Sequence, residues 1–388
     1  MKVLYIGSVF PSSENDDQVP WMRQTCRLLR QSGCEVEYLA PSLRGISSHL
    51  VDGMRVHRFR YAPAKWETLT GEEGGPSKLR RRPFVAKLLA LSYLWNGFWA
   101  LTGLLFRNKY DLVEVHWPWP HGLIALPALW AGVPVVYHYH SAELKLCLRS
   151  KPSTMVLRWL MKGAKKHIAN SSYTGQLVKQ ILPSAEVEVV AYGSPLDLGV
   201  SDAPQKIKLR KILFVGRHIE RKGINFLIDA MRLLPEEYSL TIVGVGDLTD
   251  SLKLQAADLS GRVVFAGRLS SEELAAVYAA SDLFVLPAIV DSRGDTEGLG
   301  VVLIEAVAAS LPIVASNVGG IPDVVVDRQT GLLVPQRDCV ALSQAIQKLG
   351  DDANWARQLA QNAHAHAQRY FGWENIIKQL TGLYKSVV

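Results

Sequence analysis

Cysteine is scarce in this sequence, and the spacing typical of zinc sites is missing. The 388 residues include four cysteines, and no two of them have Cys-x-x-Cys spacing. They are Cys26, Cys34, Cys147 and Cys339. Scattered single cysteines indicate neither a structural zinc site nor a disulfide framework. We therefore expect a protein of a reducing compartment.

Two nucleotide-binding patterns are also absent or incomplete. No Gly-Lys-[Ser/Thr] sequence occurs, which excludes a Walker A loop, and Gly244-Val-Gly246 and Gly298-Leu-Gly300 both lack the third glycine of a dinucleotide fingerprint. The net charge of +7 favours anionic partners in general. No recognisable nucleic-acid module accompanies that charge, so we expect no nucleic-acid partner.

Long hydrophobic runs are rare, with one exception. The apolar stretch from Met1 to Phe10 is too short for a signal peptide and predicts a first strand, so we expect a cytoplasmic protein. Residues 84–106 carry a single charge, Lys87, and follow the basic run Arg80–Arg82. This stretch is long enough for a membrane span, but it also suits a helix buried between domain layers or one docked on a membrane surface.

What the sequence does contain is an alternation of strands and helices, repeated twice. Apolar strands such as Lys2–Ile6 and Leu112–His116 alternate with helices in the first half, and Lys211–Val215 and Leu283–Leu286 do so in the second. This pattern predicts an α/β fold of two doubly wound Rossmann-like domains with mainly parallel sheets. We expect domains at 1–195 and 211–370, a linker at 196–210, and a C-terminal helix at 371–388 that packs back on the first domain.

The densest chemical signal is Asp295-Thr-Glu-Gly-Leu-Gly-Val-Val-Leu-Ile-Glu305. Gly298 and Gly300 open an apolar helix, where free backbone amides and the helix dipole attract phosphate. Glu297 precedes the helix and Glu305 lies eight residues later, which is too far for a tight acid and base pair. The two carboxylates suit two parts of one elongated ligand. Because the neighbours of Glu305 in the predicted helix are apolar, a solvated surface position for Glu305 is hard to explain.

A second signal lies at the end of the strand Lys211–Val215. Arg217 and Lys222 are five residues apart on a strand-to-helix loop, where a pair of cations neutralises a diphosphate. Arg221, between them, reads as an ordinary surface cation. The cleft between two such domains is the default place for an active site.

These motifs resemble glycosyltransferase family 4. The resemblance rests on Gly216-Arg217 with Lys222-Gly223, on the Glu297 to Glu305 spacing, and on Val318-Gly-Gly-Ile-Pro followed by Thr330-Gly-Leu-Leu-Val. It implies the GT-B fold and retention of anomeric configuration. By the same resemblance, Arg217 and Lys222 grip the donor diphosphate, Glu297 contacts the donor sugar, and Glu305 binds the ribose hydroxyls. The donor-binding positions that it implies are Gly216, Arg217, Lys222, Gly267, Arg268, Glu297, Gly298, Leu299, Gly300 and Glu305.

The N-terminal half is the acceptor half in that family, and its likeness is looser. Pro134-Val-Val-Tyr-His-Tyr-His-Ser-Ala-Glu143 resembles the strand that ends in His-Gly-x-Asp, with Ser141 in place of glycine and Glu143 in place of aspartate. This register makes His140 the residue facing the reacting sugar, with His138 as the competitor. His116 and Glu143 are further acceptor-side candidates. Trp117 and Trp119 can stack on a sugar, although packing is the commoner use of such rings.

The first loop departs from the family pattern. Many members carry a Gly-Gly pair there, whereas this chain has Pro11-Ser-Ser-Glu-Asn-Asp-Asp17. Asp16 and Asp17 are therefore candidates for binding acceptor hydroxyls. The alternative is a loop that becomes ordered only when substrate binds.

The predicted function is a retaining transfer of a hexose-type sugar from a nucleoside-diphosphate donor, UDP rather than GDP, to a glycan or lipid-linked acceptor. His140, Glu297, Arg217 and Lys222 are the predicted catalytic residues. No Asp-x-Asp occurs, and the cations supply the positive field, so we expect no metal and no cofactor. We place the enzyme in polysaccharide biosynthesis, with peripheral contact to the inner membrane face through Arg80–Arg82 and the helix after them. A sugar-phosphate synthase, a nucleotide-sugar epimerase and a non-catalytic membrane scaffold are the alternatives.

Overall fold

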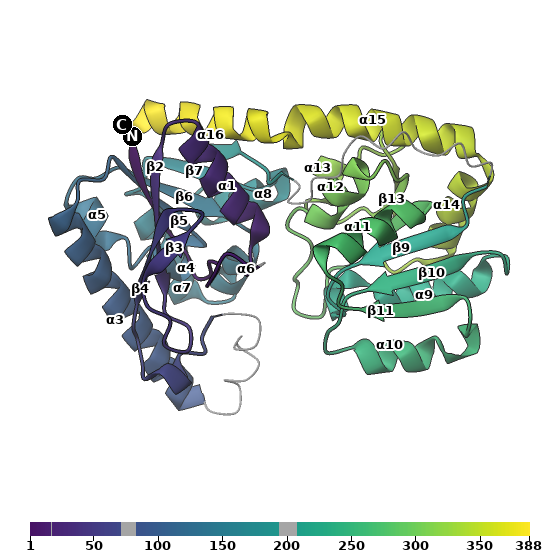
Figure 1. The fold of residues 1–388 in the computed structure, drawn as a ribbon, viewed down its shortest axis with the longest axis horizontal. Coiled ribbons are helices and arrows are strands. Elements are labelled where there is room, and N and C mark those ends of the chain that lie inside the picture. The colour runs from purple at the N-terminus through teal and green to yellow at the C-terminus, as the bar shows by residue number, and fades with distance from the viewer. Residues whose placement is uncertain (17, 71–82, 194–207) are drawn as a thin grey trace. The chain divides into compact units, whose positions relative to one another are not determined.

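The computed structural model describes residues 1–388 except 17, 71–82 and 194–207, and it divides into two units (Figure 1). Unit 1 comprises Met1–Asn170, Thr174–Val190 and Ile376–Val388. Unit 2 comprises Ser171–Tyr173 and Ala191–Asn375. The predicted linker at 196–210 lies outside the described residues except for its last three. Of those three, Leu209 is buried and Arg210 pairs with Asp351, so both belong to the packed part of unit 2.

Unit 1 is built on an eight-stranded sheet in the order β3-β4-β2-β1-β5-β6-β7-β8. Every neighbouring pair is parallel except β3 and β4. The four residues of β1 after Lys2 are fully buried, as expected for a central strand covered on both faces. The strands are β1 Lys2–Ile6, β2 Glu35–Pro41, β3 His49–Val51, β4 Met54–Phe59, β5 Leu112–His116, β6 Val135–Tyr139, β7 Lys166–Ala169 and β8 Val187–Val189.

Unit 2 is built on a six-stranded, wholly parallel sheet in the order β11-β10-β9-β12-β13-β14. Its central strands are near-continuous apolar runs, and all four residues of β12 are buried. The strands are β9 Lys211–Val215, β10 Ser239–Val243, β11 Val263–Gly267, β12 Leu283–Leu286, β13 Ile313–Ser316 and β14 Leu332–Val334. The prediction of two Rossmann-like domains is confirmed.

Helices connect the strands in both units. Those of unit 1 are α1 Pro20–Gln31, α3 Pro83–Arg107, α4 Pro118–His121, α5 Leu126–Trp130, α6 Ala142–Leu148, α7 Lys151–Met161 and α8 Ser172–Ile181. Those of unit 2 are α9 Ile224–Leu233, α10 Thr249–Gln255, α11 Ser271–Ala280, α12 Val301–Ala308, α13 Ile321–Val324, α14 Cys339–Asp351 and α15 Ala353–Phe371. Short 3₁₀ turns add η1 Ala64–Trp66, η2 Glu220–Lys222 and η3 Ala257–Leu259.

The C-terminal helix α16, Trp373–Val387, belongs to unit 1 from Ile376 onward. Its Tyr384 is fully buried and hydrogen-bonds Tyr5 of β1 at 2.6 Å between the hydroxyl oxygens. The last helix of the sequence therefore packs on the first strand, as expected.

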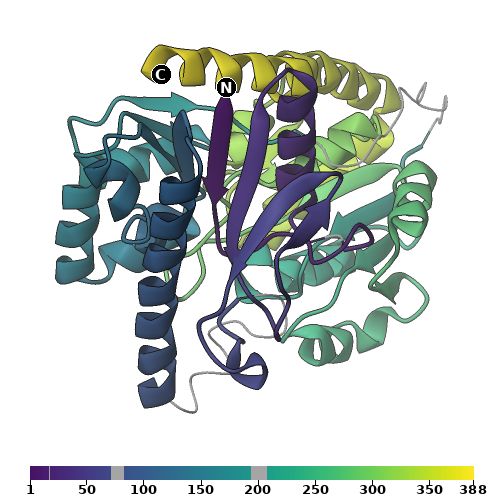
Figure 2. The same cartoon turned by 60° about the vertical axis from the view of Figure 1, so that its left-hand side comes forward.

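The long apolar stretch forms α3, the long blue helix in Figure 2. One face packs on unit 1 through Leu89, Tyr93 and Leu101, and Tyr93 hydrogen-bonds His121 at 2.8 Å. The opposite face is exposed, and only 22% of its most apolar 18-residue window is buried. The reading of a helix buried between layers is therefore wrong. Length and composition alone still allow this helix to cross a membrane, but its inner face is already occupied by the domain.

Candidate active site

In unit 2, the loops after β9 and β12 bring Arg221, Lys222 and Glu297 together, and we call these three residues the Glu297 cluster. The Lys222 ammonium lies 3.1 Å from one oxygen of Glu297, and the Arg221 guanidinium pairs with the other oxygen. Lys222 and Glu297 are both buried. Arg221 also lies 3.8 Å from a carboxylate oxygen of Asp295. With the neighbouring Arg217 the three cations exceed the two carboxylates in charge, so the cluster attracts an anion.

The ionisation of this cluster follows from its neighbours. Burial alone raises the pKa of Glu297, but Lys222 and Arg221 outweigh it and hold that pKa below its ordinary value. Burial likewise lowers the pKa of Lys222, against the opposing attraction of Glu297. The carboxylate of Glu297 is therefore ionised and held between two donors.

Arg221 and Arg217 have different surroundings in the structure. Arg221 is the ion-pair partner of Glu297, and the reading of it as an ordinary surface cation is wrong. The Arg217 side chain is exposed and forms no ion pair or side-chain hydrogen bond with any residue that the structure describes. Because Arg217 lies on the same loop, its charge adds to the positive field at Lys222 and Glu297.

Glu305 lies inside α12 and is buried, as the apolar neighbours in the sequence imply. The Tyr278 hydroxyl donates to its carboxyl at 2.9 Å. Burial raises the pKa of Glu305 to about 7, although the Tyr278 hydrogen bond opposes the shift. A buried carboxyl with one hydrogen-bond donor retains lone pairs for a ligand that brings further donors.

Glycines fix the loops that carry these groups. A Cβ on Gly320 would lie 2.1 Å from the carbonyl oxygen of Gly298, and one on Gly319 would lie 2.1 Å from that of Glu297. The Val318-Gly-Gly-Ile-Pro motif therefore packs directly against the backbone of the loop before α12. A Cβ on Gly244 would likewise lie 2.1 Å from the carbonyl oxygen of Gly216, so close backbone packing explains the glycine at this position.

The other predicted donor positions line the same edge of the sheet. Gly300 is the N-cap of α12 with φ of 87°, and no side chain caps that helix. Leu299 before it is buried. Gly267 ends β11, where its carbonyl accepts from the Gly244 amide at 2.7 Å, and the exposed Arg268 follows it. Nine of the ten predicted donor positions thus follow β9, lie at the end of β11 or immediately precede α12, and Glu305 lies inside α12.

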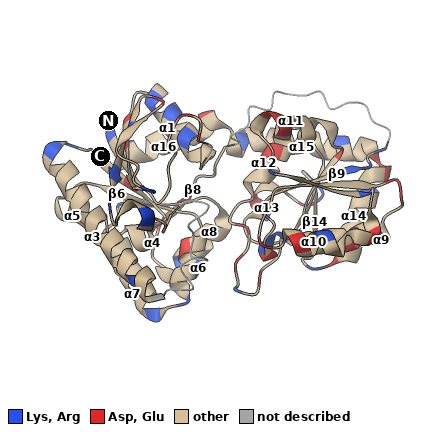
Figure 3. Cartoon of the chain, turned by 60° about the horizontal axis from the view of Figure 1, so that its bottom comes forward, with Lys and Arg blue, Asp and Glu red and all other residues tan. Residues whose placement is uncertain are grey.

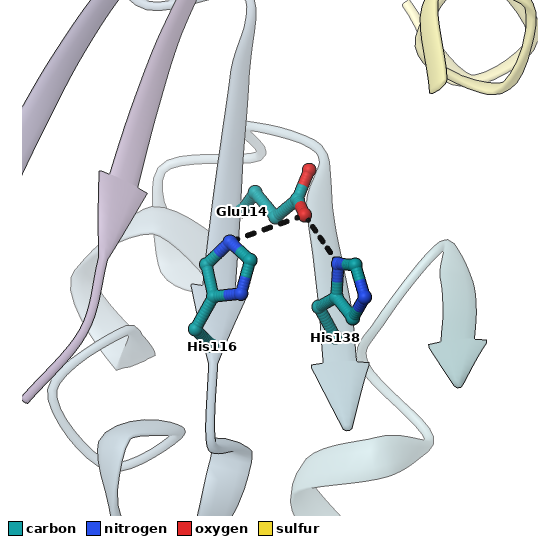
Figure 4. A group of neighbouring side chains, drawn as sticks. All are labelled: Glu114, His116 and His138. Carbon is teal, nitrogen blue, oxygen red and sulfur yellow. Dashed lines mark hydrogen bonds and ion pairs between the residues drawn. The ribbon is translucent and has the colours of Figure 1, made fainter. Parts of the chain in front are cut away.

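In unit 1, the ends of β5 and β6 bring together His116, His138 and His140, which we call the histidine cluster. The ring centroids are 4.8 to 5.2 Å apart, and all three rings stack. Glu114 on β5 lies beside them, with one carboxylate oxygen 2.9 Å from His138 Nδ1 and 3.3 Å from His116 Nε2 (Figure 4). Glu114, His116 and His138 are close enough to be considered as metal ligands.

Ser141 and Glu143 shape the turn that follows β6. Ser141 adopts φ of 78°, a conformation that glycine adopts without strain, which gives a physical reason for the glycine usual at this position. The backbone amide of His140 donates to the Glu143 carboxyl at 2.7 Å. Burial raises the pKa of Glu143 to about 7. Glu143 therefore holds the backbone of His140 in place.

The first loop has a clear local role for Asp16. Its carboxylate accepts from the Ser12 amide at 2.8 Å, the Ser12 hydroxyl at 2.6 Å and the Gln18 amide at 3.0 Å. It lines a hollow of unit 1 together with Arg58. These contacts show Asp16 organising its own loop, while Asp17 lies outside the described residues.

Sequence reasoning missed three side chains that complete these sites, Glu114, Tyr278 and Tyr384. Glu114 carried a visible signal, since it is the single charge in the otherwise uncharged strand Leu-Val-Glu-Val-His. Tyr278 and Tyr384 gave none, because an aromatic residue in an amphipathic helix is normally read as core. His138, kept as the competitor of His140, joins the same cluster instead of replacing it.

The fold and the site define a glycosyltransferase of the GT-B type. A profile described as "Glycosyl transferases group 1" matches residues 202–366, and one described as "Glycosyltransferase Family 4" matches residues 21–198. The chain belongs to glycosyltransferase family 4.

Individual relatives agree with this assignment over nearly the whole chain. Phosphatidyl-myo-inositol mannosyltransferase of Mycobacterium leprae is 28% identical over 94% of this chain and 91% of its own. The solved structure of sucrose-phosphate synthase from Thermosynechococcus elongatus is 25% identical, with a TM-score of 0.77 over 99% of this chain and 98% of its own. HepE of Anabaena, solved with UDP and glucose, shares the fold at 20% identity, with a TM-score of 0.72 over 100% of both chains.

Proposed function

We propose that this chain transfers a hexose-type sugar, with retention, from a nucleoside diphosphate to a glycan or lipid-linked acceptor in polysaccharide biosynthesis. The observation that carries the proposal is the Glu297 cluster, in which a buried carboxylate is held by Arg221 and Lys222 next to the uncapped start of α12. This arrangement offers cations and amides to a diphosphate and a carboxylate to the sugar beside it.

The reaction that fits these groups is a substitution on the front face of the donor sugar. The bond between the anomeric carbon and the leaving diphosphate breaks, and a bond from the acceptor oxygen to that carbon forms on the same face. The acceptor's proton passes to a diphosphate oxygen. Arg217 and Lys222 stabilise the charge that develops on the diphosphate, and the ionised Glu297 faces the positive charge on the sugar. Because side chains supply this field, we propose a reaction without a metal ion.

Glu305 and its neighbours bind the nucleoside part of the donor. A carboxyl 8% exposed with one tyrosine donor is suited to accept hydrogen bonds from two ribose hydroxyls. We take UDP as the nucleotide and GDP as its competitor, since the HepE structure of the same fold contains UDP.

The exposed face of α3 supports a lipid-linked acceptor. Phe84, Leu88, Leu91, Trp95, Trp99 and Phe106 form one stripe along this helix, each more than half exposed. Neither α3 nor α7 contains an acidic residue, whereas α3 carries Lys87 and Arg107 and α7 carries Lys151 and Arg158 (Figure 3). Exposed tryptophans beside cations suit an anionic bilayer surface. We therefore place the enzyme at the cytoplasmic membrane face; Arg80–Arg82 lie outside the described residues.

Calorimetric titration tests the donor site. UDP and GDP are titrated separately, with a chelator present, into the wild type, Glu305→Ala and the control Glu272→Ala, which removes an exposed carboxylate of unit 2. We expect one nucleotide to bind the wild type and the control alike, and Glu305→Ala to weaken it by tenfold or more. Binding of neither nucleotide, or binding that requires a divalent ion, would overturn the metal-free donor site.

Vesicle flotation tests the membrane surface. The wild type, the double variant Trp95→Ser with Trp99→Ser, and the control Leu254→Ser are mixed with vesicles containing phosphatidylglycerol. Leu254 is 78% exposed on α10 of unit 2, so its replacement also removes exposed apolar area, but away from α3. We expect the wild type and the control to float and the double variant to remain in solution. Equal flotation of all three proteins would contradict docking through α3.

A sugar-phosphate synthase is the second candidate, because the sucrose-phosphate synthase structure is similar over the whole chain. Product analysis separates the two functions. A synthase releases nucleotide only when a soluble sugar phosphate is supplied, whereas the proposed enzyme requires a glycan or lipid-linked acceptor.

A further inference from the structure

Three side chains of unit 1 that commonly bind metals converge on one face of the sheet. Glu114 and His116 are two positions apart on β5, so their side chains lie on the same face of that strand. His138 on β6 is the registered partner of His116. The carboxylate and the two imidazoles therefore meet on neighbouring strands, and one ligand atom from each lies within 4.8 Å of the other two (Figure 4).

The distances between these atoms suit a small ion. One oxygen of Glu114 lies 3.3 Å from His116 Nε2 and 2.9 Å from His138 Nδ1. Bonds of about 2.0–2.2 Å to a tetrahedral ion place neighbouring ligand atoms about 3.3–3.6 Å apart. The first distance already has this value. The second needs a shift of a few tenths of an ångström, which small changes of side-chain torsion supply.

Two buried ring nitrogens of the histidine cluster lack a partner. Nε2 of His116 and Nε2 of His138 form no hydrogen bond with any residue that the structure describes. His116 is 1% exposed, and its Nε2 is the atom that faces Glu114. A buried polar atom without a partner is costly and needs an explanation. A metal ion between His116 Nε2 and the carboxylate gives this nitrogen its partner.

Glu114 also lacks a permanent cation. It is fully buried, and no lysine or arginine in the described part of the chain forms an ion pair with it. Buried charges in proteins are paired or bound to metals. The other oxygen of Glu114 accepts a hydrogen bond from Tyr384 of α16, and Nδ1 of His116 lies 3.0 Å from His140 Nε2. Hydrogen bonds to the outer atoms of the ligands are typical of metal sites.

We propose that Glu114, His116 and His138 bind one zinc ion that ties β5 to β6 in unit 1. Two imidazoles and a carboxylate form a ligand set that zinc accepts, and three protein ligands leave a fourth position for a water molecule. Through the Tyr384 hydrogen bond the ion also stabilises the packing of α16 on the sheet. His116, predicted as an acceptor-side candidate, binds the ion and not the acceptor.

This zinc site is separate from the proposed donor site. The expectation of no metal followed from the missing Asp-x-Asp and from the cations of unit 2, so it stays a prediction for the donor diphosphate. The ligands of the zinc ion all belong to unit 1. The site does not depend on the proposed function, and it can be tested without any sugar donor or acceptor.

Hydrogen bonding alone is the competing explanation of the cluster. In that case His138 Nδ1 donates to Glu114 at 2.9 Å, and the carboxylate has donors from β6 and α16. This arrangement leaves His116 Nε2 beside the carboxylate without a hydrogen bond among the described residues. A zinc ion gives that nitrogen, the carboxylate and His138 one common partner, so the contacts favour the metal.

Metal analysis of the 388-residue chain, without a histidine tag, tests the site. The protein is incubated with zinc sulfate, desalted and measured by inductively coupled plasma mass spectrometry. We expect about one zinc per chain in the wild type, and about a tenth of that or less in Glu114→Gln and His138→Gln, since each loses a ligand. The controls Glu272→Gln and His364→Gln change the same residue types in unit 2 and should retain the zinc.

Tyr384→Phe keeps all three ligands and the aromatic packing, so it retains the test if the ligand variants do not fold. Loss of the outer hydrogen bond should weaken zinc affinity by about 10–100-fold. Competition with a chromophoric chelator measures the affinity. Tyr137→Phe is the matched control and should bind zinc as the wild type does, because the buried Tyr137 hydroxyl forms no hydrogen bond with the described residues.

X-ray absorption at the zinc edge identifies the ligand atoms. Spectra of the wild type should show nitrogen and oxygen ligands with the pattern of two imidazoles, and no sulfur. Wild-type protein without stoichiometric zinc, or sulfur among the ligand atoms, would overturn the proposal. Equal zinc in the wild type and the ligand variants would do so too, because it would mark an adventitious ion only. Failure of nucleotide binding would overturn the proposed function instead and leave the zinc site standing.

Discussion

The Glu297 cluster of unit 2 and the histidine cluster of unit 1 stabilise buried polar groups in opposite ways. The first keeps its groups charged, with two cations around one carboxylate. In the second, burial lowers the pKa of His116 and His140 well below the ordinary value, and the three rings stack beside one carboxylate. The contrast suits the proposed chemistry, since a leaving diphosphate needs fixed positive charge and a developing cationic sugar does not.

The largest effect should come from removing charge in unit 2. Lys222→Met leaves Glu297 with one cation and removes a charge from the diphosphate position. We expect kcat to fall by about 10²–10³-fold, the range for loss of one preorganised electrostatic group. Steady-state kinetics with the identified donor measure it, and Lys253→Met, an exposed cation of the same unit, is the control. A change below threefold, in protein shown to be folded, would remove Lys222 from the reaction.

The next effect concerns the two glycines of unit 2 that pack against the backbone of the loop before α12. Gly320→Ala forces a Cβ against the Gly298 carbonyl, and backbone atoms cannot move aside cheaply. We expect the free energy of unfolding to fall by about 2 kcal/mol or more, with weaker nucleotide binding. Urea unfolding and calorimetry measure both. Gly382→Ala in α16, where a Cβ meets nothing within 4 Å, should be neutral or stabilising.

A third prediction compares two buried carboxyls, Glu143 of unit 1 and Glu305 of unit 2, whose pKa burial raises to about 7. Glu143 and Glu305 both exceed the ordinary value of 4.5 because of burial. The folded state therefore binds protons that the unfolded state has released, and this stabilisation is present below about pH 4.5 and lost as pH rises through about 7.

We expect each group to lower the free energy of unfolding by about 1–3 kcal/mol between pH 5 and pH 8. Urea unfolding across that range measures the slope. Glu143→Gln and Glu305→Gln should each flatten it, while Glu272→Gln should not. Identical slopes in all four proteins would show that neither carboxyl is protonated in the folded state.

The smallest effect lies in the turn of unit 1. Ser141 has φ of 78°, so Ser141→Gly relieves strain at the cost of a more flexible unfolded chain. We expect a gain of about 1 kcal/mol in the free energy of unfolding. Thermal and urea unfolding measure the gain. Ser150→Gly, which instead weakens the N-cap of α7, should lose stability.

The two halves also differ in how far their sites could be predicted. In unit 2 the donor positions lie in three short segments, after β9, at the end of β11 and from the loop before α12 into that helix, so local spacing placed Glu297, Glu305 and Lys222 close to one sheet edge. Even there the reading of Arg221 as a surface cation was wrong, because the 3₁₀ turn Glu220–Lys222 directs its side chain to Glu297. In unit 1 the site depends on strand neighbours, and Glu114 and His138 meet only because β5 and β6 pair in register.

The sequence by itself determined the two-domain α/β architecture, the family and the donor-side motif. These signals are local, because periodicity along an element and spacing along one loop do not depend on distant contacts. Only the tertiary structure decided that α3 turns an apolar face outward, that Arg221 pairs with Glu297, and that Tyr384 reaches Glu114. The last pair is separated by 270 positions in the chain. Such contacts depend on which helix returns to which sheet, and no local pattern of residues encodes the partner that a buried side chain will meet.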